Sequence, residues 1–297
     1  PFNFESAEDI LRYSIDQGVN FIDTADVYSD GLSEQVVGKV VKSYKDQVFI
    51  ATKCGRRFNP HVDASYTVAA LRKSVEDSLM NMGIETIDLI QLHCPPWETY
   101  YRPEVFELFD TLKHEGKIKH LGVSVEKVEQ AIKAMEYDNV TTIQIIFNMF
   151  RQRPAELFFD MAKAKNVGII VRVPLASGLL TGSYTKDTTF EKYDHRHFNR
   201  QGAAFDKGET FSGIDYDLGL QAVEELKAYF QNVSLAKLAI HWILTHDAVS
   251  CVIPGASTLE QAQANIASFN HLFSEEDLRF IQSVYERYIK ASVHQLW

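Results

Sequence analysis

The chain has 297 residues, of which 45% are hydrophobic, and it carries a formal net charge of −10. It shows no run of Lys and Arg and no basic helical face, so nucleic acid and anionic membranes are not expected as partners. No apolar run approaches the roughly 20 residues that a membrane helix needs, and no signal peptide is visible. The cysteines Cys54, Cys94 and Cys251 form no CxxC pair, which is typical of a reducing compartment and favours a cytoplasmic protein.

Apolar strand patterns and amphipathic helix patterns alternate along the chain. The first helix is expected to begin with Ser6 as its cap and to end at Gly18, and Ser33 is expected to cap the second helix. Strands are predicted at Asn20–Asp23, Val48–Thr52, Ile87–Leu92, Leu121–Val125, Thr142–Phe147, Val167–Val173 and Val249–Ile253. Further helices are predicted at Val68–Met82, Pro103 to near Gly116, Lys127–Met135, Pro154–Ala164, Leu218–Phe230, Ser234–Thr245, Thr258–Ala267 and Glu275–Ile289.

Continuous apolar strands that are each followed by an amphipathic helix predict a parallel sheet buried on both faces. The closed version is the (β/α)8 TIM barrel, which needs one strand more than these patterns provide. Because the chain opens on Pro1 rather than Met, we expect the first strand to lie upstream of residue 1. A doubly wound open sheet is the alternative, but no GxGxxG turn follows an early strand. We predict one barrel domain over residues 1–297, with a long functional loop over residues 181–214 on the active-site face.

Polar side chains follow several predicted strands at the point where each strand ends. Asp23 ends the strand in FIDTADVY and Tyr28 lies on the loop after it, while Lys53 and His93 end the strands in FIATKCG and DLIQLHCPP. In a barrel the carboxyl ends of the strands meet at one face, where active sites lie. Each residue alone also has a purely structural explanation. Asp23 could be a turn or cap residue, Tyr28 could pack the loop, and His93 could be a hydrogen-bonded structural histidine. The combination of all four favours chemistry.

These residue types suit proton transfer to a carbonyl compound. A phenol is a poor acid near neutral pH, but a nearby ammonium makes it more acidic. Lys53 could supply that charge, Asp23 could hold Lys53 in place, and His93 could orient the carbonyl. No Ser-His-Asp or Cys-His arrangement is evident, so hydride from a nicotinamide is the expected nucleophile.

The chain resembles the aldo-keto reductase superfamily, closest to its bacterial and plant branches. The motifs GVNFIDTADVYSDGLSEQVVG, VFIATKCG, IDLIQLHCPP, GKIKHLGVS, PLASGLLTG and VIPGAS occur in the family's order over nearly the whole chain. The resemblance implies an enzyme that interconverts aldehydes or ketones with alcohols by hydride transfer from NAD(P)H. Asp23, Tyr28, Lys53 and His93 correspond to the catalytic tetrad, with Tyr28 as general acid. A small carbonyl compound is the implied partner, no metal is expected, and the oligomeric state is left open.

The resemblance also implies an extended nicotinamide dinucleotide, usually NADPH, with NADH possible. Ser124 and Gln144 match positions that hold the carboxamide, and Arg172 falls beside the nicotinamide. The remaining matches are Leu175, Ser177 and Leu180 in the loop around the pyrophosphate, and Gly255, Ser257, Gln261 and Asn265 around the adenosine.

Three departures from the family pattern concern this cofactor. Val125 follows Ser124 where many relatives have Asn. Arg172 replaces an aromatic that often stacks on the nicotinamide; its guanidinium could stack instead, or be buried against a carboxylate. The segment GASTLEQAQAN contains no Lys or Arg for a 2′-phosphate, so we expect weak discrimination between NADPH and NADH.

Other readings remain open at this point. Some relatives of the superfamily are regulatory subunits, so a cofactor-binding sensor with slow turnover is the alternative function. A sugar or polyol dehydrogenase would run the same chemistry in the oxidative direction. Clustered Asp194, His195, Arg196 and His197 resemble metal ligands, but the family needs no metal there.

Overall fold

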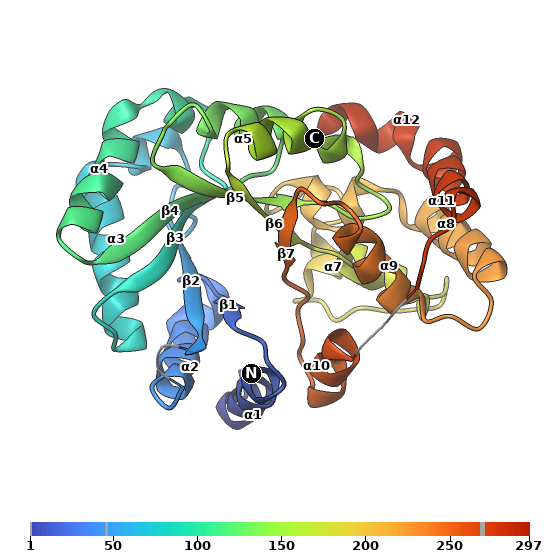
Figure 1. Ribbon diagram of the computed structural model, residues 1–297, viewed down its shortest axis with the longest axis horizontal. Helices are drawn as coiled ribbons and strands as arrows, with labels where there is room; N and C mark the ends of the chain where they lie inside the picture. The colour runs from blue at the N-terminus through green and yellow to red at the C-terminus, as the bar shows by residue number, and fades with distance from the viewer. Residues whose placement is uncertain (1, 45–46, 268–270) are drawn as a thin grey trace. The chain divides into compact units, whose positions relative to one another are not determined.

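A computed structural model describes residues 2–44, 47–267 and 271–297 (Figure 1). The chain divides into two compact units whose segments alternate along the sequence. Unit 1 comprises Pro1–Val125, Gln130–Ile143 and Gly255–Ala267, and unit 2 comprises Glu126–Glu129, Gln144–Pro254 and Ser268–Trp297. The single-domain organisation expected for residues 1–297 stays a prediction.

The strands of unit 1 follow one another in the sheet in the order of the sequence. They are β1 (Phe21–Asp23), β2 (Phe49–Cys54), β3 (Ile87–His93), β4 (Ile118–Ser124) and the first part of β5 (Val140–Ile146). β1 to β4 pair in parallel, with Lys53 opposite Gln91 and His93 opposite Ser124. A doubly wound sheet would reverse its strand order at a switch point, so the order within unit 1 argues against that alternative.

Helices alternate with these strands, as the patterns predicted. Those wholly or mostly in unit 1 are α1 (Phe4–Asp16), α2 (Leu32–Val41), α3 (Val68–Met82), α4 (Pro103–His114), α5 (Val128–Ala134) and α10 (Leu259–Ile266). α2 contacts both α1 and α3. Gly38 makes the second contact possible, because a Cβ there would come within 1.9 Å of the Met82 carbonyl oxygen at the end of α3.

Both predicted N-caps in unit 1 are wrong. The Asn3 side chain accepts a hydrogen bond from the Ser6 amide at 3.0 Å, so α1 begins earlier than expected. Asn caps helices about as well as Ser does, so Asn3 can start the helix ahead of Ser6. Gly31 precedes α2, and the Ser33 hydroxyl instead bonds the Thr24 hydroxyl at 2.7 Å.

Unit 2 contains the rest of β5 together with β6 (Gly168–Arg172) and β7 (Val249–Val252), and β6 pairs with β7 in parallel. Its helices are α6 (Phe158–Ala164), α7 (His195–Phe198), α8 (Tyr216–Tyr229), α9 (Leu235–Leu244), α11 (Glu275–Tyr288) and α12 (Lys290–Val293). α8 and α11 lie side by side (Figure 1). The predicted helix Pro154–Ala164 is broken, since a separate 3₁₀ turn covers Arg153–Ala155 before α6.

The predicted long loop, residues 181–214, begins at the end of the 3₁₀ turn Ala176–Thr181 and contains α7 and short 3₁₀ turns at Lys207–Glu209 and Phe211–Gly213. Internal hydrogen bonds give it a defined shape. The buried Asn199 side chain accepts from the amides of Ala204 and Phe205 at 2.9 and 3.0 Å. In the part of the chain that the structure describes, no helix combines the length and apolar character needed to cross a bilayer.

Candidate active site

The four residues predicted as a tetrad all belong to unit 1. Asp23 and His93 are the last residues of β1 and β3, Lys53 is next to last in β2, and Tyr28 opens the turn that follows β1. Their exposure divides their roles: 42% of Tyr28 is exposed, but only 1% of Lys53. A ligand can therefore reach Tyr28 directly, whereas Lys53 is enclosed by the protein.

Lys53 is the centre of this cluster. Its Nζ forms an ion pair with Asp23 Oδ2, donates to the Thr24 carbonyl at 2.8 Å and lies 3.4 Å from the Tyr28 hydroxyl oxygen. Burial lowers the pKa of Lys53, but the Asp23 carboxylate and Tyr28 outweigh it, so that pKa ends above its ordinary value. The ammonium is therefore charged at neutral pH, although it is almost wholly enclosed.

His93 completes the cluster. Its ring meets the Tyr28 ring edge-on, with centroids 6.1 Å apart, and its side chain is largely buried. The Lys53 Nζ lies 4.9 Å from the centroid of the same Tyr28 ring. The structure thus brings a phenol, an ammonium, a carboxylate and an imidazole together, and such a set can protonate an oxygen and stabilise the resulting phenolate.

The sequence reasoning missed Gln91. Its Nε2 donates to Asp23 Oδ1 at 3.0 Å and so holds the carboxylate on the side away from Lys53 Nζ. The signal was present in the strand pattern: Gln91 lies two residues before His93 on β3, and alternate residues share one face of a strand.

A second acid, Asp26, was also missed. It is buried, and the Ser74 hydroxyl donates to its Oδ2 at 3.1 Å. The fully buried Glu34 side chain lies near it and accepts from Thr52 Oγ1 at 2.6 Å. Burial raises the pKa of Asp26 to about 6; Ser74 opposes this shift and Glu34 adds to it.

This shift predicts how stability depends on pH. Because the folded pKa of Asp26 lies above its unfolded value, folding favours the protonated acid. That contribution is fully present below about pH 4 and is lost as pH rises through about 6, a change of about 3 kcal/mol at ~1.4 kcal/mol per pKa unit. We expect Asp26→Asn to lack this decline when unfolding by urea is measured across that range.

The exposed Asp110 of α4 gives a matched control, and Asp110→Asn should follow the wild-type profile. Parallel pH profiles for Asp26→Asn and the wild type would contradict a raised pKa for Asp26.

Residues predicted around the adenosine lie in α10 and in the segment just before it, all in unit 1. The Ser257 amide and hydroxyl both donate to Gln261 Oε1, at 2.8 and 3.0 Å, and Asn265 Nδ2 donates to the Gly255 carbonyl at 3.1 Å. Among the described residues, no atom lies within 4 Å of a Cβ built on Gly255, so a ligand can approach this backbone closely.

Ser124, predicted beside the carboxamide, ends β4 and is buried. Its hydroxyl lies 3.9 Å from the sulfur of Cys94, which follows β3. Burial raises the pKa of the other neighbouring thiol, Cys54, well above its ordinary value, so Cys54 is protonated at neutral pH. A protonated, fully buried thiol behaves as a small apolar residue.

The cofactor residues predicted in unit 2 lie along β5, β6 and the turn after β6. Gln144 is buried on β5. The Leu175 carbonyl accepts from the amides of Gly178 and Leu180, at 2.9 and 3.1 Å, and this closes the predicted pyrophosphate loop into a tight turn. The Ser177 hydroxyl donates to the Glu209 carbonyl at 3.2 Å and accepts from the Phe211 amide at 3.0 Å.

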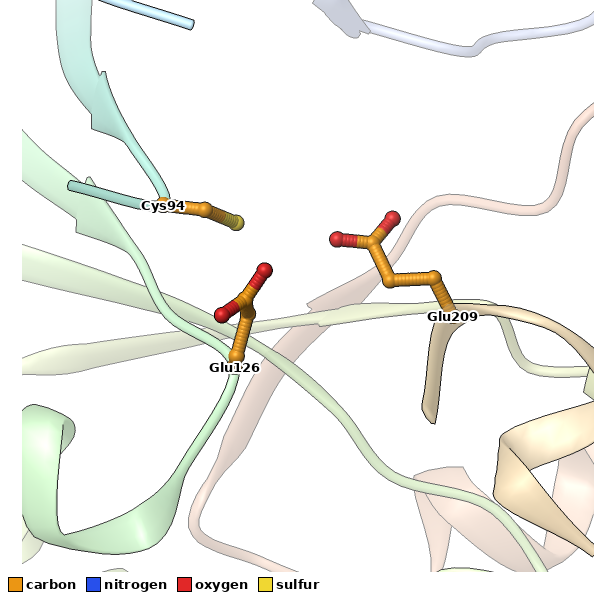
Figure 2. Close-up of side chains that lie close together, drawn as sticks. All are labelled: Cys94, Glu126 and Glu209. Carbon is orange, nitrogen blue, oxygen red and sulfur yellow. The ribbon is translucent and has the colours of Figure 1, made fainter. Parts of the chain in front are cut away.

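Arg172 pairs with a carboxylate. This is the second of the two arrangements expected from the sequence, the first being stacking on the nicotinamide. Its Nη1 lies 3.4 Å from Glu209 Oε2, and both side chains are largely buried. Glu126 and Glu209 also lie close together in unit 2, with ligand-type oxygens within 4.8 Å (Figure 2). The guanidinium therefore partly neutralises Glu209, which has a second acid beside it.

The clustered residues near position 195 have structural partners. The Asp194 carboxylate caps α7 by accepting from the Arg196 amide at 2.8 Å, and it also binds the Arg196 guanidinium. His195 Nδ1 lies 3.1 Å from the Thr210 hydroxyl. Asp194, His195 and Arg196 therefore have partners within the protein.

A sheet with parallel strands and alternating helices, carrying acid–base residues at its carboxyl edge, defines a β/α enzyme of the TIM-barrel type. A family model described as the Aldo/keto reductase family matches residues 1–286. The chain belongs to the aldo/keto reductase family and is an oxidoreductase of that type. The predicted fold class is therefore confirmed; a strand upstream of residue 1 lies outside the described residues.

Individual relatives agree with this assignment. The chain is 30% identical over 290 residues to the aldo-keto reductase YhdN of Bacillus subtilis, covering 95% of this chain and 84% of the relative. It is 27% identical over 283 residues to the NADH-specific methylglyoxal reductase of Escherichia coli, covering 91% and 84%. The holo form of aldo-keto reductase AKR11C1 from Bacillus halodurans matches with a TM-score of 0.78 and 27% identity, covering 100% of this chain and 91% of that one.

Proposed function

We propose that this oxidoreductase reduces small aldehydes or ketones to alcohols, reversibly, with NAD(P)H as hydride donor and Tyr28 as general acid. The observation that carries the proposal is the position of Lys53 Nζ, which is paired with Asp23 and lies 3.4 Å from the Tyr28 oxygen. A charged lysine beside an accessible phenol is an arrangement for releasing a proton and stabilising the phenolate.

Each side chain has a separate task in this proposal. A nicotinamide cofactor, when bound, would supply the hydride for the carbonyl carbon. Tyr28 gives its proton to the carbonyl oxygen, and Lys53 stabilises the negative charge that remains on the phenol. Asp23, held by Gln91, keeps the ammonium in place. His93 lies edge-on to Tyr28 and orients the carbonyl oxygen toward it.

The residues proposed to hold the cofactor suit a dinucleotide. The accessible backbone at Gly255 and the hydroxyl of Ser257 provide polar groups for the adenosine. Gln144 and Ser124 supply groups for the carboxamide, and the turn that contains Leu175, Ser177 and Leu180 surrounds the pyrophosphate. NADPH is the cofactor of first choice by family resemblance, with NADH as the second.

We expect a weak preference between these two cofactors. The segment from Gly255 to Asn265 contains no Lys or Arg, so no bidentate cation is available there for a 2′-phosphate. The measurement is kcat/KM for NADPH and NADH with one substrate, and the ratio should stay within about a hundredfold. A preference for NADPH above about a thousandfold, roughly 4 kcal/mol, would contradict the expectation. Adding a cation with Gln261→Arg should shift the ratio toward NADPH.

Turnover of small carbonyl compounds tests the function itself. We expect the protein to consume NAD(P)H in the presence of small aldehydes and ketoaldehydes such as methylglyoxal, with the matching alcohol as product. Tight cofactor binding without turnover of any such compound would instead favour the sensor. We further infer a cytoplasmic location, which is supported by three reduced cysteine thiols, all of them in the described part of the chain.

A further inference from the structure

Trp297 packs against the long loop, residues 181–214, in unit 2. The Trp297 side chain is buried, and its Nε1 donates to Asp206 Oδ1 at 2.7 Å. The Gly208 amide donates to the same oxygen at 2.7 Å. We call residues 206–213 the anchored segment, because contacts on both of its sides fix it.

Arg151 contacts both the Trp297 ring and the anchored segment. Its guanidinium carbon lies 4.3 Å from the centroid of the Trp297 ring, and Nη2 donates to the carbonyls of Gly208 and Ser212 at 2.8 and 3.2 Å. Burial lowers the pKa of Arg151 to about 9. A buried cation that depends on carbonyls and an indole face is stabilised substantially by that indole.

Two glycines of the anchored segment, Gly208 and Gly213, lie against the Trp297 indole ring. A Cβ on Gly208 would come within 2.6 Å of Trp297 Cε2 and 2.4 Å of Arg151 Nη2. A Cβ on Gly213 would come within 2.5 Å of Trp297 Cη2, and Gly213 also has a φ of +81°, which other residues rarely adopt. No larger side chain fits at either glycine while the ring is in place.

The other side of the anchored segment contacts residues that we assign to the cofactor. The Glu209 carboxylate pairs with Arg172 at 3.4 Å, and its carbonyl accepts from the Ser177 hydroxyl at 3.2 Å. The Phe211 amide donates to the same hydroxyl at 3.0 Å. One short segment therefore joins the indole to both Arg172 and Ser177.

We propose that Trp297 is a positioning residue for the nicotinamide cofactor, acting through the anchored segment on Arg172 and Ser177. The proposal rests on the proposed function, because it takes these two residues as cofactor contacts. Removing the indole leaves a cavity beside a buried cation, which admits water and loosens the segment. Arg172 and Ser177 then lose the partners that hold them in one arrangement before the cofactor binds.

The test compares Trp297→Ala with the wild type by titration of NADPH. We expect the dissociation constant for NADPH to rise at least about tenfold. At saturating NADPH, kcat and the KM for the carbonyl compound should change less than about threefold, because the Tyr28 cluster is untouched. Trp297→Phe keeps an aromatic ring but loses the bond to Asp206 and part of the packed indole surface, so it should recover only part of the affinity.

A matched control separates positioning from general loss of stability. Leu112→Ala, on the buried face of α4 in unit 1, should lower Tm without weakening NADPH binding. If Trp297→Ala is too unstable to assay, Gly213→Ala disturbs the same contact from the other side and should also weaken NADPH binding. NADPH binding by these variants that equals the wild type would overturn the proposal. A wild-type protein that binds no nicotinamide dinucleotide would instead defeat the proposed function.

Discussion

Tyr28→Phe is expected to lower kcat by about a thousandfold, while the dissociation constant for NADPH stays within about twofold of the wild type. The change removes one oxygen and leaves a ring that can still meet His93 edge-on. It removes the proton that a carbonyl oxygen would receive and the oxygen that lies 3.4 Å from Lys53 Nζ. The measurement pairs steady-state reduction of a small aldehyde with an equilibrium titration of NADPH.

Tyr44→Phe is the matched control for this change. The Tyr44 hydroxyl donates to Asp16 at 2.9 Å in an exposed part of unit 1, so losing it should leave turnover unchanged. If Tyr28→Phe retained more than about a tenth of wild-type kcat, another group would have to be the general acid.

Lys53→Met should have the largest effect on stability. Only 1% of the Lys53 side chain and 7% of the Asp23 side chain are exposed, so the change leaves a buried carboxylate without the cation that is bonded to it. Breaking a buried ion pair from one side costs about 3–5 kcal/mol. The free energy of unfolding should fall by that order in urea, and turnover should be lost as well.

A double-mutant cycle identifies the cause of this loss. Asp23→Asn removes the negative charge, so the double variant Asp23→Asn/Lys53→Met should be more stable than Lys53→Met alone. Additive effects of the two changes, or a loss below about 1 kcal/mol for Lys53→Met, would mean that the pair is hydrated rather than enclosed.

The sequence predicted the strand ends well because each one is a local pattern. The motifs FIDTADVY, FIATKCG and DLIQLHCPP each end an apolar run in a polar residue. The parallel order of β1, β2 and β3 then brings Asp23, Lys53 and His93 together, although the residues are far apart along the chain. This step required only the fold class.

Other features depend on contacts that no local pattern contains. Asp26 lies in the same motif as Asp23, and its pKa is raised by burial in the folded protein and by nearby Glu34, against the hydrogen bond from Ser74. The partner of Arg172 is Glu209, on a loop whose course the sequence did not predict. Trp297 meets Asp206 across 91 positions of the chain, and nothing near either residue indicates the contact.

The exposure of Tyr28 has a consequence for the cycle as a whole. A phenol that has given up its proton must regain one before the next substrate can react. With 42% of this residue in contact with solvent, a water molecule can return the proton directly between turnovers. On the role proposed for Tyr28, the phenol therefore needs no internal relay of side chains to regain its proton, and the enclosed Lys53 can keep its charge throughout.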